Sequence, residues 1–164
     1  MRIIATTILA ALALAGAPAS AQAVMLNFSF AEMRQQMTDL KSTFKREAVT
    51  DEGVRFVEAE AESGLIYAIY GLECDNKEAT QRCRGAEMVA SFKLKDEGDV
   101  PDALAEIDYA AVADYKGDDG RLKLSRYVIF DNGITAANLK VNLEVFLNIS
   151  EDVWDYLDEE GYLD

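Results

Sequence analysis

The two cysteines of this chain, Cys74 and Cys83, are the residues whose spacing says most about possible chemistry. Eight residues separate them, whereas a redox dithiol usually has two, and the chain has no histidine that would lower the pKa of a thiol. A zinc site needs about four ligands, so carboxylates would have to complete it. We therefore expect a structural disulfide between Cys74 and Cys83, with redox activity and metal binding as the alternatives.

A row of three glutamates, Glu58, Glu60 and Glu62, is the second candidate for chemistry. Residues two apart on a strand point to the same face, so these carboxylates would lie beside Phe56 on one surface of a strand expected over residues 54–61. Like charges in such a row repel one another unless water or cations meet them. We expect a solvated face, and the alternative is a site where carboxylate oxygens coordinate a hard cation.

The absence of histidine removes the usual base of enzymes that use a nucleophile. A Ser-His-acid or Cys-His arrangement cannot be built, and no glycine-rich phosphate loop of the Walker or dinucleotide type occurs. Two facing carboxylates, as in glycosidases, remain an alternative, but no pair among the 30 acidic residues is marked by its spacing. We predict that the protein is not an enzyme, and we assign it no catalytic residue and no cofactor.

The first 21 residues have the pattern of a secretory signal peptide. Arg2 gives a positive start, residues 3–15 are apolar and uncharged, and residues 17–21 end in the small-residue pattern that signal peptidase accepts. The apolar run is shorter than the ~20 residues of a membrane span, and no later stretch resembles one. We predict cleavage after Ala21 and a single domain over residues 22–164, in the bacterial periplasm or secreted, where a disulfide persists.

The composition is strongly acidic, with a net charge of −14 at pH 7. Loss of the first 21 residues would remove Arg2 and no acidic residue, so the charge would become about −15. Such a polyanion repels phosphate groups, so we expect no nucleic-acid partner, no binding to anionic membranes and no membrane insertion after cleavage. The charge favours solubility, and it would also attract cations or a basic partner.

Two apolar runs beside the cysteines predict the centre of the fold. Residues 65–70 are apolar on both faces, which is typical of an interior strand covered on two sides. Residues 86–94 alternate between apolar and polar side chains, as in a strand with one wet face. The polar residues between the runs predict an exposed loop. We expect antiparallel neighbours, whose disulfide would contribute roughly 2.5–3 kcal/mol by restricting the unfolded chain.

Capping residues and apolar periodicity predict the other elements. Ser29 and Glu32 match a capping box at the start of a helix over residues 30–43, whose apolar stripe would end with Phe44, and Thr135 suits the cap of a last helix. The acidic end, residues 155–164, is expected to fray. The remaining predicted elements are strands over residues 44–49 and 54–61, a helix over 102–113, a turn at 117–120 between two strands, the second of them over 121–131, and the last helix over 136–158.

The fold class predicted from these elements is α+β. It consists of a single antiparallel sheet flanked by helices, in the order α-β-β-β-β-α-β-β-α.

The order of elements and the residues at their turns resemble the YbjN family of bacterial proteins. The residues that carry the resemblance are Tyr70-Gly-Leu-Glu-Cys74, Cys83 and the strand after it, residues 115–122 (Tyr-Lys-Gly-Asp-Asp-Gly-Arg-Leu) and residues 131–139 (Asp-Asn-Gly-Ile-Thr-Ala-Ala-Asn-Leu). The resemblance covers nearly the whole chain after residue 21. It implies a fold similar to that of type III secretion chaperones, and a role as a sensory transduction regulator.

The resulting functional hypothesis is a non-enzymatic exported domain that binds a protein or peptide, in a chaperone-like or a regulatory role. We expect the surface between the sheet and its flanking helices to be the place of binding. The alternatives are a cation-responsive or small-ligand-binding module that uses Glu58, Glu60 and Glu62, and a hydrolase that depends on carboxylates.

Overall fold

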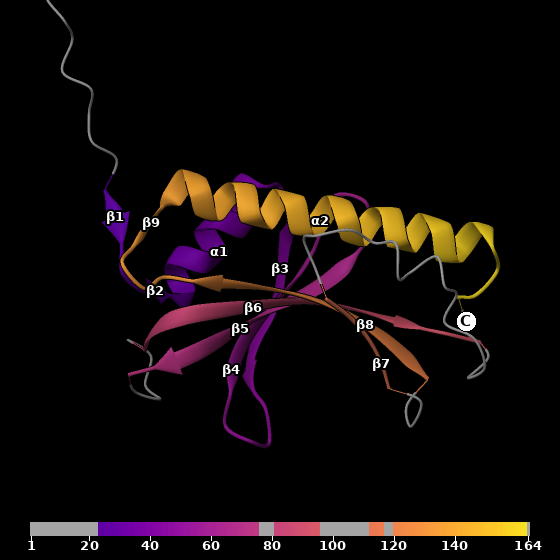
Figure 1. Ribbon diagram of the computed structural model, residues 1–164, viewed down its shortest axis with the longest axis horizontal. Helices are drawn as coiled ribbons and strands as arrows, with labels where there is room; N and C mark the ends of the chain where they lie inside the picture. Colours follow the sequence, from indigo (N-terminus) through magenta and orange to yellow (C-terminus); the bar gives the residue numbers. More distant parts are fainter. Residues whose placement is uncertain (1–22, 76–80, 96–111, 117–119, 164) are drawn as a thin grey trace, which may run out of the picture.

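The computed structural model describes residues 23–75, 81–95, 112–116 and 120–163 (Figure 1). The predicted signal peptide, the middle of the loop between the cysteines, most of the helix expected over residues 102–113 and the turn at 117–119 lie outside the described residues. The elements in chain order are β1 (Val24–Met25), β2 (Phe28–Ser29), α1 (Phe30–Asp39), β3 (Thr43–Val49), β4 (Arg55–Glu60), β5 (Ile66–Cys74), β6 (Arg82–Lys93), β7 (Val112–Lys116), β8 (Arg121–Ile129), β9 (Ile134–Thr135) and α2 (Ala136–Glu159).

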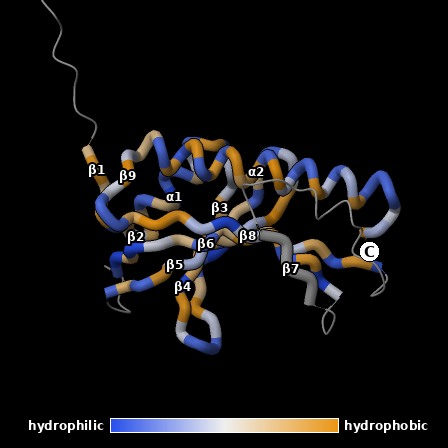
Figure 2. Tube along the Cα trace, viewed as in Figure 1, coloured by the Kyte–Doolittle hydropathy of each residue, from blue (hydrophilic) through white to orange (hydrophobic). Residues whose placement is uncertain are grey.

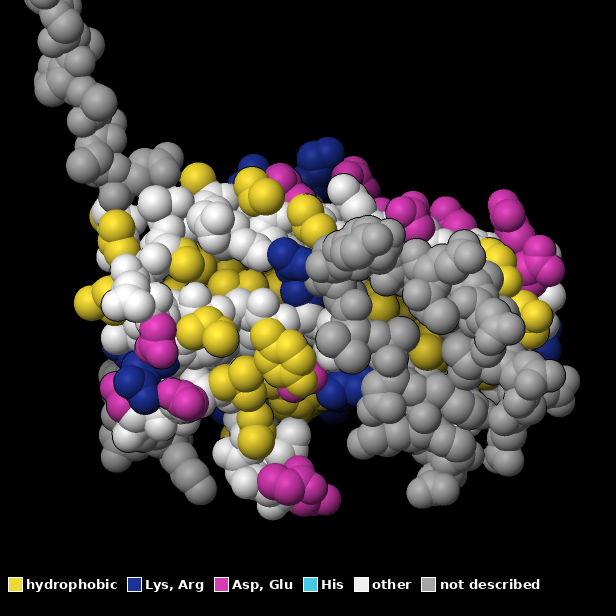
Figure 3. Space-filling model, viewed as in Figure 1, with side chains coloured by type: hydrophobic (Ala, Val, Ile, Leu, Met, Phe, Trp, Pro, Cys, Tyr) yellow, Lys and Arg dark blue, Asp and Glu magenta, His cyan; other side chains and the backbone are white. Residues whose placement is uncertain are grey.

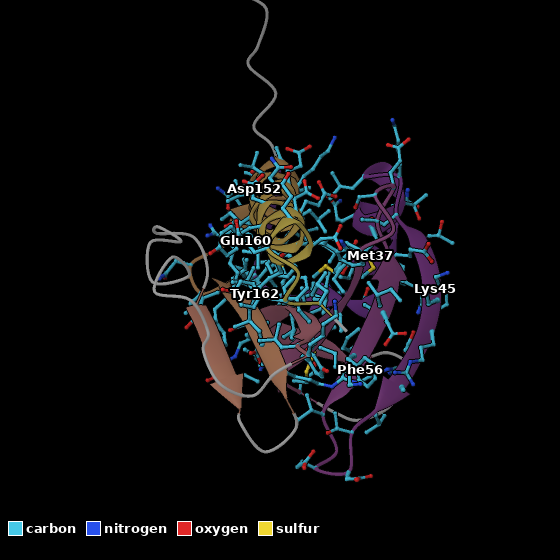
Figure 4. All side chains as sticks on the ribbon, turned by 90° about the vertical axis from the view of Figure 1, so that its right-hand side faces the viewer. Met37, Lys45, Phe56, Asp152, Glu160 and Tyr162 are labelled. Carbon is cyan, nitrogen blue, oxygen red and sulfur yellow. A yellow bond between two sulfur atoms is a disulfide. The ribbon has the colours of Figure 1, made fainter. Side chains whose placement is uncertain are left out.

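Seven strands form one curled antiparallel sheet, which confirms the predicted α+β class. Six of them follow the order β3-β4-β5-β6-β8-β7, and β2 pairs with the beginning of β6. Strands β1 and β9 make a separate two-stranded ribbon at the start of α2. Helices α1 and α2 lie on the same face of the sheet, and the sheet curls around them (Figures 1 and 4). We call this the inner face and the opposite one the outer face.

The hydrophobic core lies between the inner face and the two helices. Along α2, hydrophobic and hydrophilic residues alternate at helical spacing (Figure 2), and its hydrophobic side faces the sheet. In the core, the Tyr67 hydroxyl donates a hydrogen bond of 2.9 Å to Ser42 Oγ, so its polar group is satisfied. The largest fully buried side chains are Tyr67, Phe28, Phe130, Phe146, Met33, Met37, Ile69, Met88, Leu122, Leu124, Leu139 and Leu143.

Helix α1 begins at the predicted capping box but ends earlier than expected. The Glu32 N–H donates to Ser29 Oγ (3.3 Å), and the Ser29 N–H donates to the Glu32 carboxylate (2.7 Å). The helix ends at Asp39 because Lys41 adopts a φ of 60°, a left-handed conformation that turns the chain into β3. The placement of Phe44 on the helical stripe is therefore wrong, since it lies on β3 and is exposed.

Helix α2 agrees with its prediction at both ends. Thr135 caps it, because its Oγ1 accepts a hydrogen bond of 3.1 Å from the Asn138 N–H. The apolar positions that predicted the helix are the ones that it buries, including Leu143, Phe146 and Leu157. Periodicity over more than twenty residues is a strong signal, so α2 could be found without any knowledge of the sheet.

The prediction that residues 155–164 fray is wrong. The Tyr162 N–H donates to the Leu157 carbonyl (2.8 Å), and the Lys95 N–H donates to the Tyr162 carbonyl (2.9 Å). Leu163 forms a β-bridge with Leu94 at the end of β6. Tyr162 and Leu163 are thus held against the sheet by backbone bonds and by their apolar side chains, a contact that acidic composition does not reveal.

Three short strands and one helix boundary also differ from expectation. Strands β1, β2 and β9 have two residues each, too few to show any periodic pattern in the sequence. The helix expected over residues 102–113 is wrong at its end, because Val112 and Ala113 belong to β7. Their backbone pairs with β8, opposite Ser125 and Leu124. Pairing with a neighbouring strand therefore decides the structure here.

Candidate binding surface

The outer face of the sheet carries apolar side chains that neither α1 nor α2 covers. Tyr67 and Ile69 of β5 point inward and are buried, whereas Ile66, Ala68 and Tyr70 alternate with them and point outward. Ile66 is 52% exposed. Strand β5 is central, between β4 and β6, as predicted. The prediction that it is covered on both sides is wrong, because both helices pack on the inner face.

Strand β8 adds two more exposed apolar side chains to this face. Tyr127 is 54% exposed and Ile129 is 66% exposed. Tyr127 lies opposite Glu87 of β6, and Ile129 lies opposite Gly85. Hydrophobic side chains gather on the strands below α2, with charged side chains at their margin (Figure 3). The sequence contains a signal for these residues, since Tyr127 and Ile129 fall on the otherwise polar side of the β8 pattern.

An aromatic pair lies on the outer face, on the neighbouring strands β4 and β5. The rings of Phe56 on β4 and Tyr70 on β5 are 5.1 Å apart between centroids, and the Arg46 guanidinium lies 5.4 Å from the Phe56 ring. Burial raises the pKa of Tyr70, so its hydroxyl stays protonated at neutral pH and keeps its donor. Phe56 is only 8% exposed and Tyr70 is half-buried, so Tyr70 presents most of the accessible surface of this pair and its one polar group.

Glu87 organises the neighbouring polar side chains. It accepts hydrogen bonds from Lys123 Nζ (2.9 Å) and from the Tyr127 hydroxyl (3.1 Å). Burial by itself would lower the pKa of Lys123, but the hydrogen bond and the charge of Glu87 outweigh it and raise that pKa. The amine is therefore charged at neutral pH, which makes it a poor base or nucleophile and a good partner for a carboxylate.

The three glutamates predicted to share one surface each lie beside a cation of the same chain. A β-bulge between Phe44 and Arg46 adds an extra residue to β3, so that two successive basic side chains reach the glutamates of β4. Among the described residues, no group of three or more Cys, Asp or Glu side chains could hold a metal ion. The ion pairs are Arg46–Glu58 (2.9 Å), Lys45–Glu60 and Lys41–Glu62 (3.2 Å).

A shallow hollow of about 280 Å³ lies on the outer face beside the aromatic pair. Sites for small molecules are usually enclosed and measure roughly 300–1,000 Å³, so this hollow is small and open by comparison. It suits a side chain of a partner better than a buried metabolite. The described residues that line it are Glu58, Ile66, Tyr67, Ala68, Tyr70, Val89, Ser91 and Arg121.

The disulfide between Cys74 and Cys83 is present. The two residues are directly opposite each other in the pairing of β5 with β6, and their Cα atoms are 3.9 Å apart. The side chain of Cys83 is fully buried and that of Cys74 is partly buried. A Cβ built on Gly71 would lie 2.6 Å and 2.8 Å from the two sulfurs and 2.8 Å from Phe30, so the bridge packs tightly over this glycine.

The space between the sheet and the helices, where a partner was expected to bind, is filled by the core. Tyr67 on β5 and Phe146 on α2 meet there with ring centroids 6.3 Å apart, and both are buried. A small hollow remains at the margin of this space, beside Trp154 of α2. Among the described residues, the outer face carries exposed apolar side chains that a large partner could cover.

The structure thus joins Cys74 to Cys83 and places Glu58, Glu60 and Glu62 each beside a lysine or arginine. It also reveals the exposed apolar side chains of the outer face. Within the described residues, no helix is both long and apolar enough to cross a membrane. Comparisons of the chain with known protein families, with curated proteins and with solved structures found no match.

Proposed function

We propose that this protein is an exported, non-enzymatic domain that binds a protein or peptide through the outer face of its sheet. The observation that carries the proposal is the set of large apolar side chains at Ile66, Tyr127 and Ile129, which are more than half exposed on the face that also holds the Phe56–Tyr70 pair. Contiguous apolar side chains rimmed by polar ones are typical of surfaces that bind other proteins.

The charges of the outer face favour an apolar segment of a polypeptide as the partner. Glu58, Glu60 and Glu87 are each paired with a lysine or arginine, so the face has little net charge although the whole chain has −14. A ligand therefore gains most by covering apolar and aromatic area. The open shape of the hollow supports a protein surface or extended peptide over a small molecule.

Three further observations support an exported binding domain. The first 21 residues have the pattern of a signal peptide. The Cys74–Cys83 disulfide suits an oxidising compartment such as the bacterial periplasm. The resemblance to the YbjN family, with its chaperone-like fold, is in keeping with a protein that acts by binding and carries out no reaction of its own.

Site-specific photo-crosslinking in intact cells tests this proposal. A photo-reactive amino acid is placed at position 129 on the outer face, and in a second variant at position 31, where Ala31 is exposed on α1. We expect a discrete adduct from position 129 and none from position 31. The adduct should disappear when Ile66→Ser and Tyr127→Ser are added, because the partner loses its apolar contacts.

The control for that loss is Val141→Ser, which removes an apolar side chain of the same exposure (52%) from α2. It should leave the adduct unchanged. Equal adducts from positions 31 and 129, no adduct from either, or the same loss with Val141→Ser would each contradict binding through the outer face.

A further inference from the structure

A second hollow lies between the turn that joins β4 to β5 and the C-terminal half of α2. Its volume is about 130 Å³, far below the roughly 300 Å³ at which pockets for small molecules begin. A space of this size holds one side chain. Its lining consists of Ser63, Leu65, Glu151, Trp154 and Asp155.

Trp154 gives the hollow an aromatic wall. The indole is 38% exposed, which is unusual for the largest apolar side chain of the chain. It is held by an edge-on contact with Phe92 of β6, whose ring centroid is 6.4 Å away at an interplanar angle of 88°. Leu65 is buried beside it. The face of an indole attracts a cation within about 6 Å, more strongly than other aromatic rings do.

Two carboxylates stand beside this aromatic wall. Glu151 and Asp155 are four residues apart on α2, so they share one side of the helix. The Ser63 hydroxyl donates a hydrogen bond of 2.6 Å to Glu151 Oε1, which ties that carboxylate to the turn between β4 and β5. An aromatic face with two neighbouring carboxylates is an arrangement that suits a lysine ammonium or an arginine guanidinium.

The surroundings of the hollow strengthen its attraction for a cation. Acidic side chains gather over the C-terminal half of α2 (Figure 3), and Asp152 lies on the side of α2 away from the sheet (Figure 4). Residues 141–164 contain no lysine or arginine. The acidic residues in this range are Glu144, Glu151, Asp152, Asp155, Asp158, Glu159, Glu160 and Asp164.

This distribution of charge opposes the stability of α2. The C-terminus of a helix is the negative end of its dipole, where cations stabilise and anions destabilise. The last turn of α2 has no basic residue, and acidic residues four apart, such as Glu151 and Asp155, repel each other. Lys95 Nζ lies 3.4 Å from the Gly161 carbonyl and offsets part of this charge. A positive partner would relieve the rest.

We infer that the hollow beside Trp154 binds a single lysine or arginine side chain of a basic polypeptide segment. The charge of the surrounding helix selects a basic segment, Trp154 covers the apolar stem and faces the cation, and Glu151 with Asp155 accepts its N–H groups. A polypeptide is favoured over a metal ion because one wall is aromatic and apolar. The inference goes beyond binding at the outer face and does not depend on it.

Trp154 itself reports on this site, because it is the only tryptophan of the chain. The protein after signal removal is titrated with a blocked peptide of alternating lysine and glycine, and with the same peptide carrying glutamine at each lysine. Tryptophan emission should change with the lysine peptide and stay constant with the glutamine peptide and with matched sodium chloride. Glu151→Gln combined with Asp155→Asn should weaken binding about tenfold, which corresponds to about 1.4 kcal/mol.

The matched control is Asp51→Asn with Glu52→Gln, which makes the same change of charge at the exposed turn between β3 and β4. It should weaken binding less than twofold. Ile66→Ser with Tyr127→Ser, which tests the outer face, should leave the Trp154 signal unchanged. An equal loss in the control pair would mean that only the overall charge attracts the peptide, and it would overturn the inference. Constant emission with the lysine peptide would overturn it as well.

Discussion

Strand β5 carries isoleucine on both of its faces, and the two side chains have opposite environments. Ile69 on the inner face is completely buried in the core under the helices, whereas Ile66, three residues earlier on the outer face, is 52% exposed. Both lie on a central strand: β4 pairs with β5 at both residues, and β6 pairs with β5 from Tyr67 onward. The difference is caused by the helices, which pack against one face only.

This contrast separates the residues that hold the fold together from those that are available for binding. On the inner face, apolar side chains leave water when the chain folds, and their burial stabilises the protein. On the outer face, ion pairs such as Lys123–Glu87 and Arg46–Glu58 surround apolar side chains that stay partly in water. That exposed area would be buried only when a partner binds.

Matched substitutions on the two faces of β5 test the contrast most strongly. Ile69→Ala should lower the free energy of unfolding by about 3 kcal/mol, because it leaves a cavity in the core. Ile66→Ala should lower it by less than about 0.5 kcal/mol, because the side chain is already half in water. Urea denaturation of the protein after signal removal measures both. Equal losses would show that the outer face is also covered in solution.

Removal of the disulfide should have the next largest effect. Cys74→Ala combined with Cys83→Ala should lower the free energy of unfolding by roughly 2.5–3 kcal/mol, because the unfolded chain is no longer closed into a loop of about ten residues. Reduction of the wild-type protein by dithiothreitol, followed by the same denaturation, serves as the independent control. A loss below about 1 kcal/mol in both measurements would mean that the disulfide contributes little to the stability of the folded protein.

Gly71→Ala tests how tightly the inner face is packed around the bridge. The new Cβ would meet both sulfurs and Phe30 at less than 3.0 Å, so we expect a loss of about 1–3 kcal/mol in stability from overpacking. In the protein that lacks both cysteines the same substitution should cost clearly less, because two of its three close contacts are gone. Equal costs in the two backgrounds would contradict this packing.

Glu87→Gln on the outer face should change the pKa of Lys123 clearly but the stability of the protein only slightly. The pKa of Lys123 is raised above its ordinary value of 10.5, so the stabilisation from the pair is present below pH 10.5 and is lost as the pH rises through the pKa in the folded state. The substitution should lower that pKa and cost less than about 1 kcal/mol. NMR titration of the Lys123 side chain measures it, with Glu58→Gln as the control. A pKa unchanged by Glu87→Gln would refute the pairing.

Short-range patterns in the sequence identify the two helices and the central hairpin of this protein. The capping box at Ser29, the cap at Thr135 and the long apolar period of α2 identify the helices, because each depends on residues within a few turns of one another. The apolar run before Cys74 and the alternating run after Cys83 identify the central hairpin, and the spacing of the cysteines predicts their bond. Such short-range signals need no knowledge of the rest of the chain.

Which apolar face becomes core and which charges are paired depends on how distant elements pack against one another. Alternation reveals that Ile66 and Ile69 point to opposite sides, but not that both helices pack on the side of Ile69. The ion pairs of Glu58 and Glu60 depend on the bulge in β3, and the hollow at Trp154 depends on a turn and a helix about ninety residues apart. Contacts between distant elements set these features, because burial and electrostatic pairing are properties of the packed assembly and not of any single segment.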